Sequence, residues 1–332
     1  MAAFVRLFRT KWITPPEPTT TDYSGRVIIV TGATSGIGKE AVYKFAALGA
    51  SKVIIAARDL EKGASTKEEL AKRLGRSDQL EVWGLDMMYY DSVVAFASRA
   101  QSLEHLDVVI LNAGLRRSTY HVGEHGWEQD LQVNTLSSVL LGVLLLPKLK
   151  QSKHYTGKTP VLEFVNSGLH QSAVVTTDIR QQPNILEYYN NRENFKEGSQ
   201  YKYTKVFLMY AVNKLASEIC SADVIITSIC PGAIKTDLGR DHYFPGVFIL
   251  AAALVFLFLM SPSQGANTIL SGTTQGELVH GRFWKNDKIQ PVSLAVAGTE
   301  MKELGSRIWD EIVEALKKDV STFSKALDTA LH

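Results

Sequence analysis

Short apolar runs alternate with longer stretches of helical periodicity from residue 26 onward. The runs are rich in β-branched residues, as buried strands are, and they cover 26–30, 53–57, 80–85, 107–111, 161–165 and 224–229. Strands that alternate with helices form a parallel sheet with right-handed crossovers and helices on both faces. Because no repeat or low-complexity linker interrupts this order, we predict an α/β fold with a doubly wound parallel sheet, in a single domain over residues 24–300.

Two terminal segments flank this predicted domain. Residues 1–23 form an N-terminal arm, in which Arg6, Arg9 and Lys11 stand among apolar residues ahead of a proline-rich stretch. The arm lacks the long apolar core of a signal peptide, so we expect it to lie over the domain, with an interfacial membrane contact as the alternative. Residues 301–332 have one apolar side at helical spacing and are predicted to form a C-terminal helix packed on the domain.

Residues 247–260, VFILAAALVFLFLM, are fourteen apolar residues without a charge. They are too few to cross a bilayer as a helix, which takes about 18 residues or more. Three alternatives stay open: a buried or pocket-lining helix, an interfacial helix through which a lipophilic substrate enters from a membrane, and the contact face of a homo-oligomer. Each of them implies an apolar substrate or partner.

Composition narrows the class of partner. The chain of 332 residues has a net charge of +2 and scattered basic residues, so we expect no nucleic-acid partner. Its two cysteines, Cys220 and Cys230, form no CxxC pattern and cannot build a disulfide framework or a metal cage of their own. We therefore expect a reducing, cytoplasmic location and no bound metal.

The segment from Thr31 to Gly38, TGATSGIG, follows the first predicted strand and precedes a predicted helix at 39–48. Glycines let the backbone turn sharply and approach a phosphate closely, and the N-terminus of a helix attracts its charge. A strand, a glycine loop and a helix in this order predict a dinucleotide site. Its expected contacts in this segment are Gly32, Ser35, Gly36, Ile37 and Gly38.

The ends of later strands extend this site. Arg58 follows the second strand, where a guanidinium favours the 2′-phosphate of NADP, although Asp59 comes directly after it. Asp86 follows the third strand and is expected to accept a hydrogen bond from the adenine amino group. We therefore expect NADP(H) rather than NAD(H). Small residues that leave room for a cofactor close the fourth strand: Asn112, Ala113 and Gly114.

Two Tyr-x-x-x-Lys pairs compete for the role of proton donor, Tyr201 with Lys205 and Tyr210 with Lys214. The spacing of four residues places each pair on one helix face, where the lysine cation lowers the pKa of the phenol from its ordinary value of about 10. The two tyrosines are nine residues apart, which places them on opposite sides of one helix. Tyr210 lies among apolar residues and is expected to pack, so we assign Tyr201 as the acid.

Taken in order, these motifs resemble those of the classical short-chain dehydrogenase/reductase family, and most closely its fungal and retinol-dehydrogenase-like members. The resemblance extends over residues 26–275. It rests on TGATSGIG at 31–38, LNAG at 111–114, Asn134 after QV, Ser167 after the fifth strand, YKYTK at 201–205 and PGAIKT at 231–236. It implies a Rossmann fold and hydride transfer between a nicotinamide cofactor and an alcohol or carbonyl group.

The resemblance also implies a role for each residue of the motifs. Ser167 polarises the substrate carbonyl, and Tyr201 transfers the proton. Lys205 holds the nicotinamide ribose and tunes Tyr201, whereas Asn134 anchors a helix kink and a proton-relaying water. Structural alternatives exist, since Ser167 could cap a strand and Asn134 could be a buried amide satisfied by backbone. The residues expected to flank the nicotinamide amide and the phosphates are Pro231, Gly232 and Thr236.

The chain departs from the family pattern near the catalytic serine. Asn166 stands where the family usually has a second serine, and Ser167 and Tyr201 are 34 residues apart, well beyond the usual spacing. The excess, at 176–198, resembles the longer loop of retinol-dehydrogenase-like and fungal members. We expect this insertion to help shape the substrate pocket.

We therefore predict an NADP(H)-dependent oxidoreductase that interconverts a ketone or aldehyde and an alcohol on a lipophilic substrate, with Tyr201 as general acid/base. A tailoring step of secondary-metabolite biosynthesis fits this chemistry. One alternative is a retinoid- or steroid-type dehydrogenase at a membrane surface. The other is a non-catalytic NADP(H)-binding redox sensor. The intact set of Ser167, Tyr201 and Lys205 argues against the sensor, which needs no acid with a tuned pKa.

Overall fold

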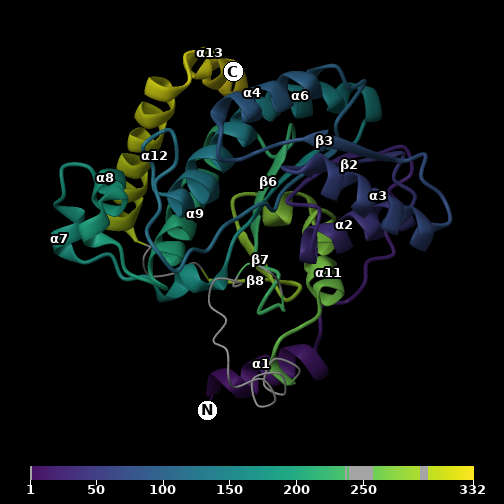
Figure 1. The fold of residues 1–332 in the computed structure, drawn as a ribbon, viewed down its shortest axis with the longest axis horizontal. Helices are drawn as coiled ribbons and strands as arrows, with labels where there is room; N and C mark the ends of the chain where they lie inside the picture. The colour runs from purple at the N-terminus through teal and green to yellow at the C-terminus, as the bar shows by residue number, and fades with distance from the viewer. Residues whose placement is uncertain (1, 236–237, 239–256, 292–297) are drawn as a thin grey trace.

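The computed structural model describes residues 2–235, 238, 257–291 and 298–332. Within these ranges the strands form one sheet in the order β3-β2-β1-β4-β5-β6-β7-β8 (Figure 1). Neighbouring strands pair in parallel except β7 and β8, which are antiparallel. The strands are β1 (Val27–Thr31), β2 (Lys52–Ala57), β3 (Leu80–Gly84), β4 (Val108–Leu111), β5 (Val161–Val165), β6 (Ile225–Ile229), β7 (Phe283–Lys285) and β8 (Lys288–Ile289). The predicted doubly wound parallel sheet is therefore confirmed, and β7 and β8 extend it.

Helices cover both faces of the sheet. One face packs against α4 (Tyr90–Gln101), α6 (Ser138–Thr156) and α9 (Gln200–Glu218), and the other against α2 (Gly36–Ala47), α3 (Leu60–Leu74) and α11 (Pro262–Gly272). Shorter segments connect them: α5 (Gln129–Leu131), the π-helical η1 (Gln132–Ser137), and the 3-10 segments η2 (Gly168–Ser172) and η5 (Gly276–Val279). This arrangement leaves the carboxyl ends of the strands free to form a site.

Strand β1 shows why the strands are continuously apolar. Val27 and Ile29 belong to the core beneath α4, α6 and α9, whereas Ile28 and Val30 belong to the core beneath α2, α3 and α11. Successive side chains of a strand point to opposite faces, and both faces of this sheet are covered. Every position of the strand is therefore buried, as the unbroken apolar run in the sequence indicates.

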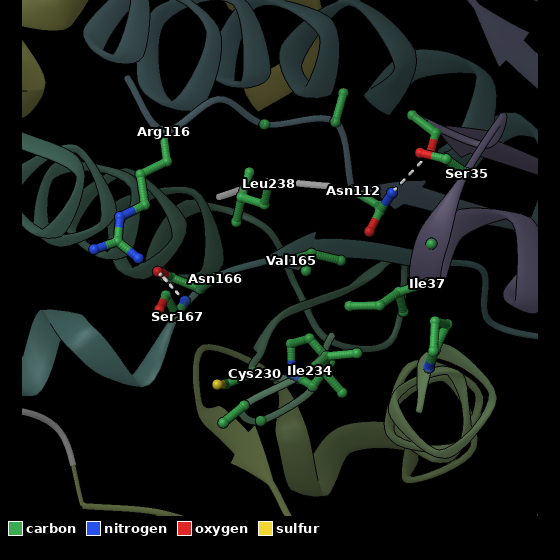
Figure 2. Close-up of a pocket in the computed structure, with 18 of the residues that line it drawn as sticks. Ser35, Ile37, Asn112, Arg116, Val165, Asn166, Ser167, Cys230, Ile234 and Leu238 are labelled. Atoms are coloured by element: carbon green, nitrogen blue, oxygen red, sulfur yellow. Dashed lines mark hydrogen bonds between the residues drawn. The ribbon is translucent and has the colours of Figure 1, made fainter. Parts of the chain in front are cut away.

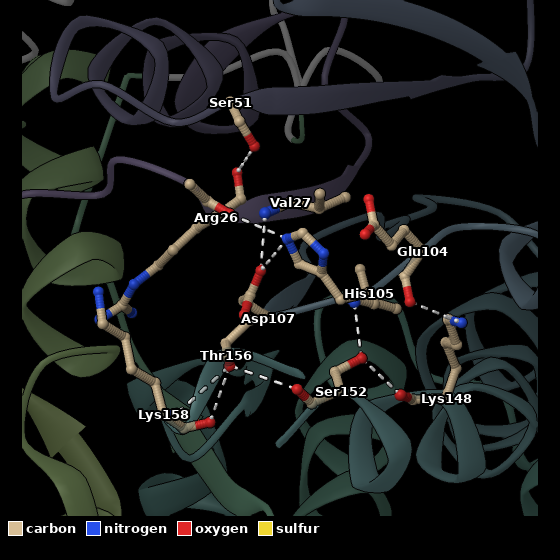
Figure 3. A network of polar contacts seen from close by, with 12 residues as sticks. Arg26, Val27, Ser51, Glu104, His105, Asp107, Lys148, Ser152, Thr156 and Lys158 are labelled. Atoms are coloured by element: carbon tan, nitrogen blue, oxygen red, sulfur yellow. Dashed lines mark hydrogen bonds and ion pairs between the residues drawn. The ribbon is translucent and has the colours of Figure 1, made fainter. Parts of the chain in front are cut away.

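A polar network fixes the opposite, amino-terminal edge of the sheet (Figure 3). The backbone N–H of Val27 donates to Asp107 Oδ2 at 2.8 Å, and His105 Nε2 lies 3.3 Å from the same oxygen. The Ser152 hydroxyl in α6 accepts a hydrogen bond from Leu106 N at 2.7 Å. These contacts join the starts of β1 and β4 to α6, and so set the register in which the carboxyl ends of the strands meet.

The helical stretch Gln129–Thr156 is long and apolar enough to cross a membrane, since its most apolar window of 18 residues has a mean hydropathy of 1.4. However, 89% of its most apolar window is buried inside the protein. Burial of this extent is typical of the core helix of a globular fold. We therefore interpret α6, with the π-helical turn before it, as the central helix of one layer.

The two ends of the chain form helices at opposite ends of the molecule (Figure 1). The N-terminal arm contains α1 (Ala2–Trp12). The segment predicted as one C-terminal helix forms two, α12 (Thr299–Asp319) and α13 (Phe323–Leu331), because the chain turns between Val320 and Thr322. Helix α12 packs on α9 and α13 packs on α6, so both extend the helical layer of that face.

Candidate active site

A cavity of about 1510 Å³ opens at the carboxyl ends of the parallel strands (Figure 2). Open α/β sheets bind their ligands at this edge, where the strand order reverses. Most of the residues that the sequence predicts as a site line it together. They are Gly32, Ser35, Gly36, Ile37, Arg58, Asp86, Asn112, Ala113, Gly114, Ser167, Tyr201, Lys205, Pro231 and Gly232.

The glycine loop has the shape that a pyrophosphate requires. Gly32 has φ 62°, and a Cβ atom there would lie 2.9 Å from Ala113 Cα. Gly36, with φ 54°, is the first residue of α2, and the preceding Ser35 makes no side-chain capping bond. The N–H groups of the first helical turn are therefore available to an anion, at the positive end of the helix dipole. The loop fits the phosphates of a dinucleotide.

Gly38 does not line the cavity, although it belongs to the predicted loop. A Cβ atom at Gly38 would lie 2.5 Å from Gly32 O and 2.6 Å from Asn112 Nδ2. Asn112 Nδ2 donates to Thr31 O at 2.8 Å and to Gly32 O at 3.3 Å. Gly38 therefore permits close packing that supports the loop from behind, and Asn112 joins the loop to the end of β4.

The adenosine side of the cavity is lined by Arg58, Asp59 and Asp86. Asp59 is the N-cap of α3, and its side chain accepts a hydrogen bond from Lys62 N at 3.0 Å. This capping role accounts for the acidic residue that follows Arg58 in the sequence. Asp86 Oδ1 accepts from Met88 N at 2.9 Å, so one carboxylate oxygen is already engaged in a turn. Arg58 is exposed and lies at the cavity, where a phosphate could reach it.

Tyr201, Lys205 and Ser167 come together on one wall of the cavity. Tyr201 and Lys205 are buried in the first part of α9, one turn apart, with Lys205 Nζ 5.8 Å from the Tyr201 ring centroid. Lys205 Nζ donates to Val165 O at 2.9 Å, which fixes the ammonium at the end of β5. Ser167 follows this strand and hydrogen-bonds to the Tyr201 side chain. The geometry thus brings a hydroxyl, a phenol and a cation to one point.

Burial shifts the pKa values of this group. The expected lowering of the Tyr201 pKa is wrong for this structure: burial raises the pKa of the phenol above its ordinary value, and the hydrogen bond with Ser167 and the charge of Arg116 offset this only in part. Burial lowers the pKa of the Lys205 ammonium to about 8. At neutral pH the phenol therefore holds its proton, and the lysine is mostly charged. A protonated phenol beside a cation is suited to donate to a carbonyl oxygen.

Asn134 lies behind this wall and, unlike the other predicted catalytic residues, is absent from the described lining of the cavity. It is fully buried in η1, where its Oδ1 accepts from Leu115 N at 2.8 Å. Its Nδ2 donates to Leu115 O at 2.9 Å and to Thr204 Oγ1 at 3.1 Å. The side chain therefore joins the π-helical turn to the loop after β4 and to α9. This placement agrees with the predicted anchoring of a helix kink, and also with a buried amide satisfied by its neighbours.

Tyr210, the other candidate acid, lies on the far side of α9 from Tyr201. Its ring packs against α12, because a Cβ atom at Gly305 would lie 2.6 Å from Tyr210 Cδ1. Burial also raises the pKa of its phenol. The predicted packing role of Tyr210 agrees with this placement, and the nine-residue offset on one helix is its cause.

Three residues near the site were not singled out as functional by the sequence. Asn166 Oδ1 accepts from Ser167 N at 2.8 Å, and its Nδ2 donates to Lys205 O at 3.2 Å, so it holds Ser167 against α9. Cys230 Sγ accepts from Gly168 N at 3.1 Å. Arg116 points toward Ser167 (Figure 2). The departure from the family's serine pair was the available signal for Asn166, whereas no pattern marked Cys230 or Arg116.

Part of the predicted site lies outside the described residues. Thr236 and residues 247–256 of the apolar segment belong to this part, whereas the end of that segment is described. Met260 pairs with the PGAIKT motif, since its N–H donates to Ala233 O at 2.9 Å and Lys235 N donates to its carbonyl at 3.1 Å. A Cβ atom at Gly232, where φ is 95°, would lie 2.5 Å from Met260 Cε. The end of the apolar segment therefore packs directly on the Pro231-Gly232 turn.

The insertion at 176–198 lies elsewhere than predicted. It forms α7 (Thr177–Arg180), α8 (Ile185–Asn190) and η3 (Arg192–Asn194), and none of its residues, all of which are described, lines the cavity. Glu311 Oε2 in α12 accepts from the N–H groups of Ile185 and Leu186 at 2.8 and 2.9 Å. The insertion is therefore anchored to α12, and its apolar side chains fill the core rather than the pocket.

Comparisons with known proteins agree with this geometry. A family model for short chain dehydrogenase matches residues 26–158. The short-chain dehydrogenase/reductase phmF of Phaeosphaeria nodorum is 36% identical over 94% of this chain and 92% of its own length. The protein ffsI of Aspergillus flavipes, of the same description, is 35% identical over 94% of this chain and 92% of its own. A solved short-chain dehydrogenase from Sphingobium yanoikuyae in complex with NADPH has a TM-score of 0.56 at 19% identity, over 89% of this chain and 96% of that one.

The chain therefore belongs to the short-chain dehydrogenase/reductase family, as its motifs indicate. It is an oxidoreductase that interconverts CH–OH and C=O groups with NAD(P) as cofactor. The predicted Rossmann fold and enzyme class are confirmed, and the alternative of a non-catalytic sensor is set aside.

Proposed function

We propose that this oxidoreductase uses NADP(H) and acts on a lipophilic ketone or alcohol, with Tyr201 as general acid/base. The convergence of Tyr201, Ser167 and Lys205 on one wall of the cavity carries this proposal. When bound, the nicotinamide supplies or accepts the hydride. The fold brings the glycine loop and this wall to the same cavity, so that both substrates of a hydride transfer can meet there.

The roles of the side chains follow from charge. As a carbonyl is reduced, negative charge develops on its oxygen, and the hydroxyls of Ser167 and Tyr201 stabilise it by hydrogen bonds. Tyr201 then gives up its proton, and the neighbouring Lys205 cation stabilises the phenolate that remains. Asn134 holds the π-helical turn against α9 and acts as a positioning residue. In the oxidative direction the same groups act in reverse.

The preference for NADP(H) rests on Arg58. Arg58 and Lys62 line the adenosine side of the cavity, and the carboxylate of Asp59 is occupied as a helix cap. Two cations at this place favour the 2′-phosphate of NADP. The related fold from Sphingobium yanoikuyae has NADPH bound, which is consistent with this preference.

The choice of a lipophilic substrate rests on the apolar lining beyond the glycine loop. Side chains there that can contact such a substrate are Leu115, Leu169, Leu238, Leu259 and Met260. The relatives phmF and ffsI are fungal, and a tailoring step of secondary-metabolite biosynthesis would supply substrates of this kind. We propose such a step, in the cytoplasm, as the biological setting.

Oxidation of NADPH, with NADH in parallel, against a panel of carbonyl compounds tests the proposal. The panel sets bicyclic and long-chain ketones against sugars with a free carbonyl. We expect turnover of the lipophilic ketones with NADPH, slower turnover with NADH, and none with the sugars. Equal rates with both cofactors would remove the NADP(H) preference, and turnover of sugars alone would remove the lipophilic substrate.

A second element of the proposal concerns a membrane surface, and α1 favours it. The helix exposes its apolar side chains: Phe4, Val5, Phe8 and Trp12 are 55%, 61%, 41% and 47% exposed. Leu7, Thr10 and Lys11 line the cavity, and so do Arg6 and Trp12 at the edges of the exposed face. Arg6 and Arg9 are exposed beside the apolar face, and the helix contains no acidic residue. An outward apolar face flanked by arginines fits the surface of an anionic bilayer.

The position of α1 connects this face to the substrate. Phe4 packs against Phe258 with ring centroids 5.1 Å apart, and Trp12 Nε1 donates to Leu257 O at 2.9 Å. Helix α1 is therefore joined to the end of the apolar segment at the mouth of the cavity. A lipophilic substrate could pass from the bilayer into the site without crossing water.

Sedimentation with anionic phospholipid vesicles tests the membrane contact. We expect the protein to sediment with the vesicles and the double variant Val5→Glu, Phe8→Glu to stay in solution. Tyr155→Glu is the matched control, since Tyr155 is 61% exposed on α6. Wild-type protein that stays in solution, or a control that loses binding equally, would contradict the contact.

A further inference from the structure

Arg116 stands beside the catalytic wall without an assigned role. It follows Gly114 by two residues in the loop after β4 and lines the cavity. Its guanidinium carbon is 5.9 Å from the Tyr201 ring centroid. Figure 2 shows the guanidinium pointing toward Ser167 and Asn166. Arg116 is therefore close to the place where a substrate carbonyl would be held.

The guanidinium lacks an anionic or hydrogen-bonding partner within the described parts of the chain. Arg116 Nε is buried and donates no hydrogen bond to any described acceptor. The neighbouring Arg117 differs, because its Nε donates to Gln129 Oε1 at 3.0 Å. A buried N–H donor without a partner is costly, and a ligand that accepts its hydrogen bond would remove this cost.

Within the described residues, no carboxylate of the protein pairs with Arg116. Among the described residues that line the cavity, the acidic ones are Asp59 and Asp86. Both belong to the adenosine side, where Asp59 caps α3 and Asp86 closes a turn. Since the described residues supply no such partner, we look for it in a bound molecule.

The phosphates of the dinucleotide are not this partner. They are expected at the glycine loop, and Figure 2 shows Ser35 and Ile37 of that loop across the cavity from Arg116. Arg116 lies instead with Ser167 and Tyr201, which address the substrate. An anion that pairs with Arg116 would therefore belong to the substrate.

We propose that Arg116 determines specificity by binding an anionic oxygen group of the substrate, close to the reacting carbonyl. A guanidinium presents parallel N–H donors that match a carboxylate in a bidentate pair. The inference rests on the proposed function and deepens it: the substrate has an apolar body and an acidic group near the carbonyl. This group would also orient the carbonyl toward Tyr201.

A matched pair of probes tests the inference, namely a γ-keto acid with a phenyl group and its methyl ester. Binding of each is measured by the fluorescence of NADPH bound to the protein, and turnover by NADPH oxidation. We expect the wild-type protein to bind the acid more tightly than the ester. Arg116→Gln should weaken binding of the acid roughly tenfold to a hundredfold, the loss of one charged hydrogen-bond pair, and leave the ester unchanged.

Two further variants serve as controls. Arg117→Gln removes the same charge one residue away and should keep the preference for the acid, since the Arg117 guanidinium is already paired with Gln129. Arg116→Lys keeps the charge but lacks the parallel N–H donors, so it should give an intermediate loss of affinity for the acid.

The outcomes separate the inference from the proposed function. Wild-type protein that binds acid and ester equally, or binds neither, overturns the inference. It is also overturned if Arg116→Gln slows turnover of both probes alike and shifts the pH profile, because Arg116 would then act only through Tyr201. If the acid binds in an Arg116-dependent manner but neither probe is reduced, the inference holds and the proposed ketone reduction fails.

Discussion

Substitution of Gly38 by alanine tests the glycine loop most sharply, because the structure defines what the added atom meets. The Cβ atom would lie 2.5 Å from the carbonyl oxygen of Gly32 and 2.6 Å from Asn112 Nδ2. Both are fixed, the first as backbone and the second by its hydrogen bond to Thr31 O. The loop must therefore move, and α2 must shift away from β4.

The expected magnitude combines three effects. Overpacking of this kind costs about 1–3 kcal/mol. Loss of the Asn112 hydrogen bonds costs about 1 kcal/mol each. Alanine within a helix regains about 0.5–1 kcal/mol over glycine. The steric and hydrogen-bond losses exceed the gain in helix propensity, and we expect a net loss of roughly 2–4 kcal/mol in the free energy of unfolding.

Urea unfolding and NADPH titration measure the two consequences of Gly38→Ala. Besides the loss of stability, we expect at least about a tenfold loss of NADPH affinity, since the Gly32 backbone must move. Gly84→Ala is the matched control, because its Cβ atom would meet nothing closer than Leu60 Cδ2 at 3.7 Å. A Gly38→Ala protein with wild-type stability and NADPH affinity would refute the account of the loop.

Two further substitutions test charges. Glu163 in β5 is fully buried without a hydrogen-bond partner among the described residues, and burial raises its pKa well above the ordinary value. The folded chain therefore keeps a proton that the unfolded chain releases, and stability falls by up to about 1.4 kcal/mol per pH unit as pH rises between the two pKa values. Glu163→Gln removes this loss, so its advantage over wild type in urea unfolding should grow as pH rises above about 5; parallel curves would contradict it. Arg58→Ala should weaken NADPH binding about tenfold and spare NADH in fluorescence titrations, since an exposed charge contributes modestly. Equal losses for both cofactors would show that Arg58 does not select the 2′-phosphate.

The sheet was predictable because burial on both faces makes each parallel strand an unbroken apolar run. The apolar runs in the sequence match the observed ends of β1 to β6 to within about one residue. β7 and β8 are three and two residues long, and they form because β7 pairs with β6 and β8 pairs with β7, so no local pattern marks them. The sequence also predicts one helix where the structure has α12 and α13. The helical spacing of apolar residues continues across the turn between them, so the spacing does not show where α12 ends.

The site was predictable where its chemistry depends on local spacing. The four-residue spacing of Tyr201 and Lys205 fixes their common helix face, and the glycine loop fixes its own turn. Contacts between distant segments were not predictable in this way. Two such contacts are the hydrogen bond from Asn166 to the Lys205 carbonyl in α9 and the approach of Arg116 to Tyr201. Both depend on how the loops after β4 and β5 meet. The insertion at 176–198 was placed at the pocket by its position in sequence, whereas Glu311 draws it to α12.

The central claim is that Tyr201 delivers the proton that accompanies hydride transfer. Its most direct test is the transfer of deuterium from the C4 position of labelled NADPH to a lipophilic ketone, with Tyr201→Phe beside wild type and Tyr210→Phe as the control on the opposite side of α9. We expect Tyr201→Phe to lower the rate of transfer by about 10²–10⁴-fold, the usual contribution of a general acid, while NADPH still binds. Tyr210→Phe should transfer deuterium as wild type does. Transfer at the wild-type rate by Tyr201→Phe would contradict the claim.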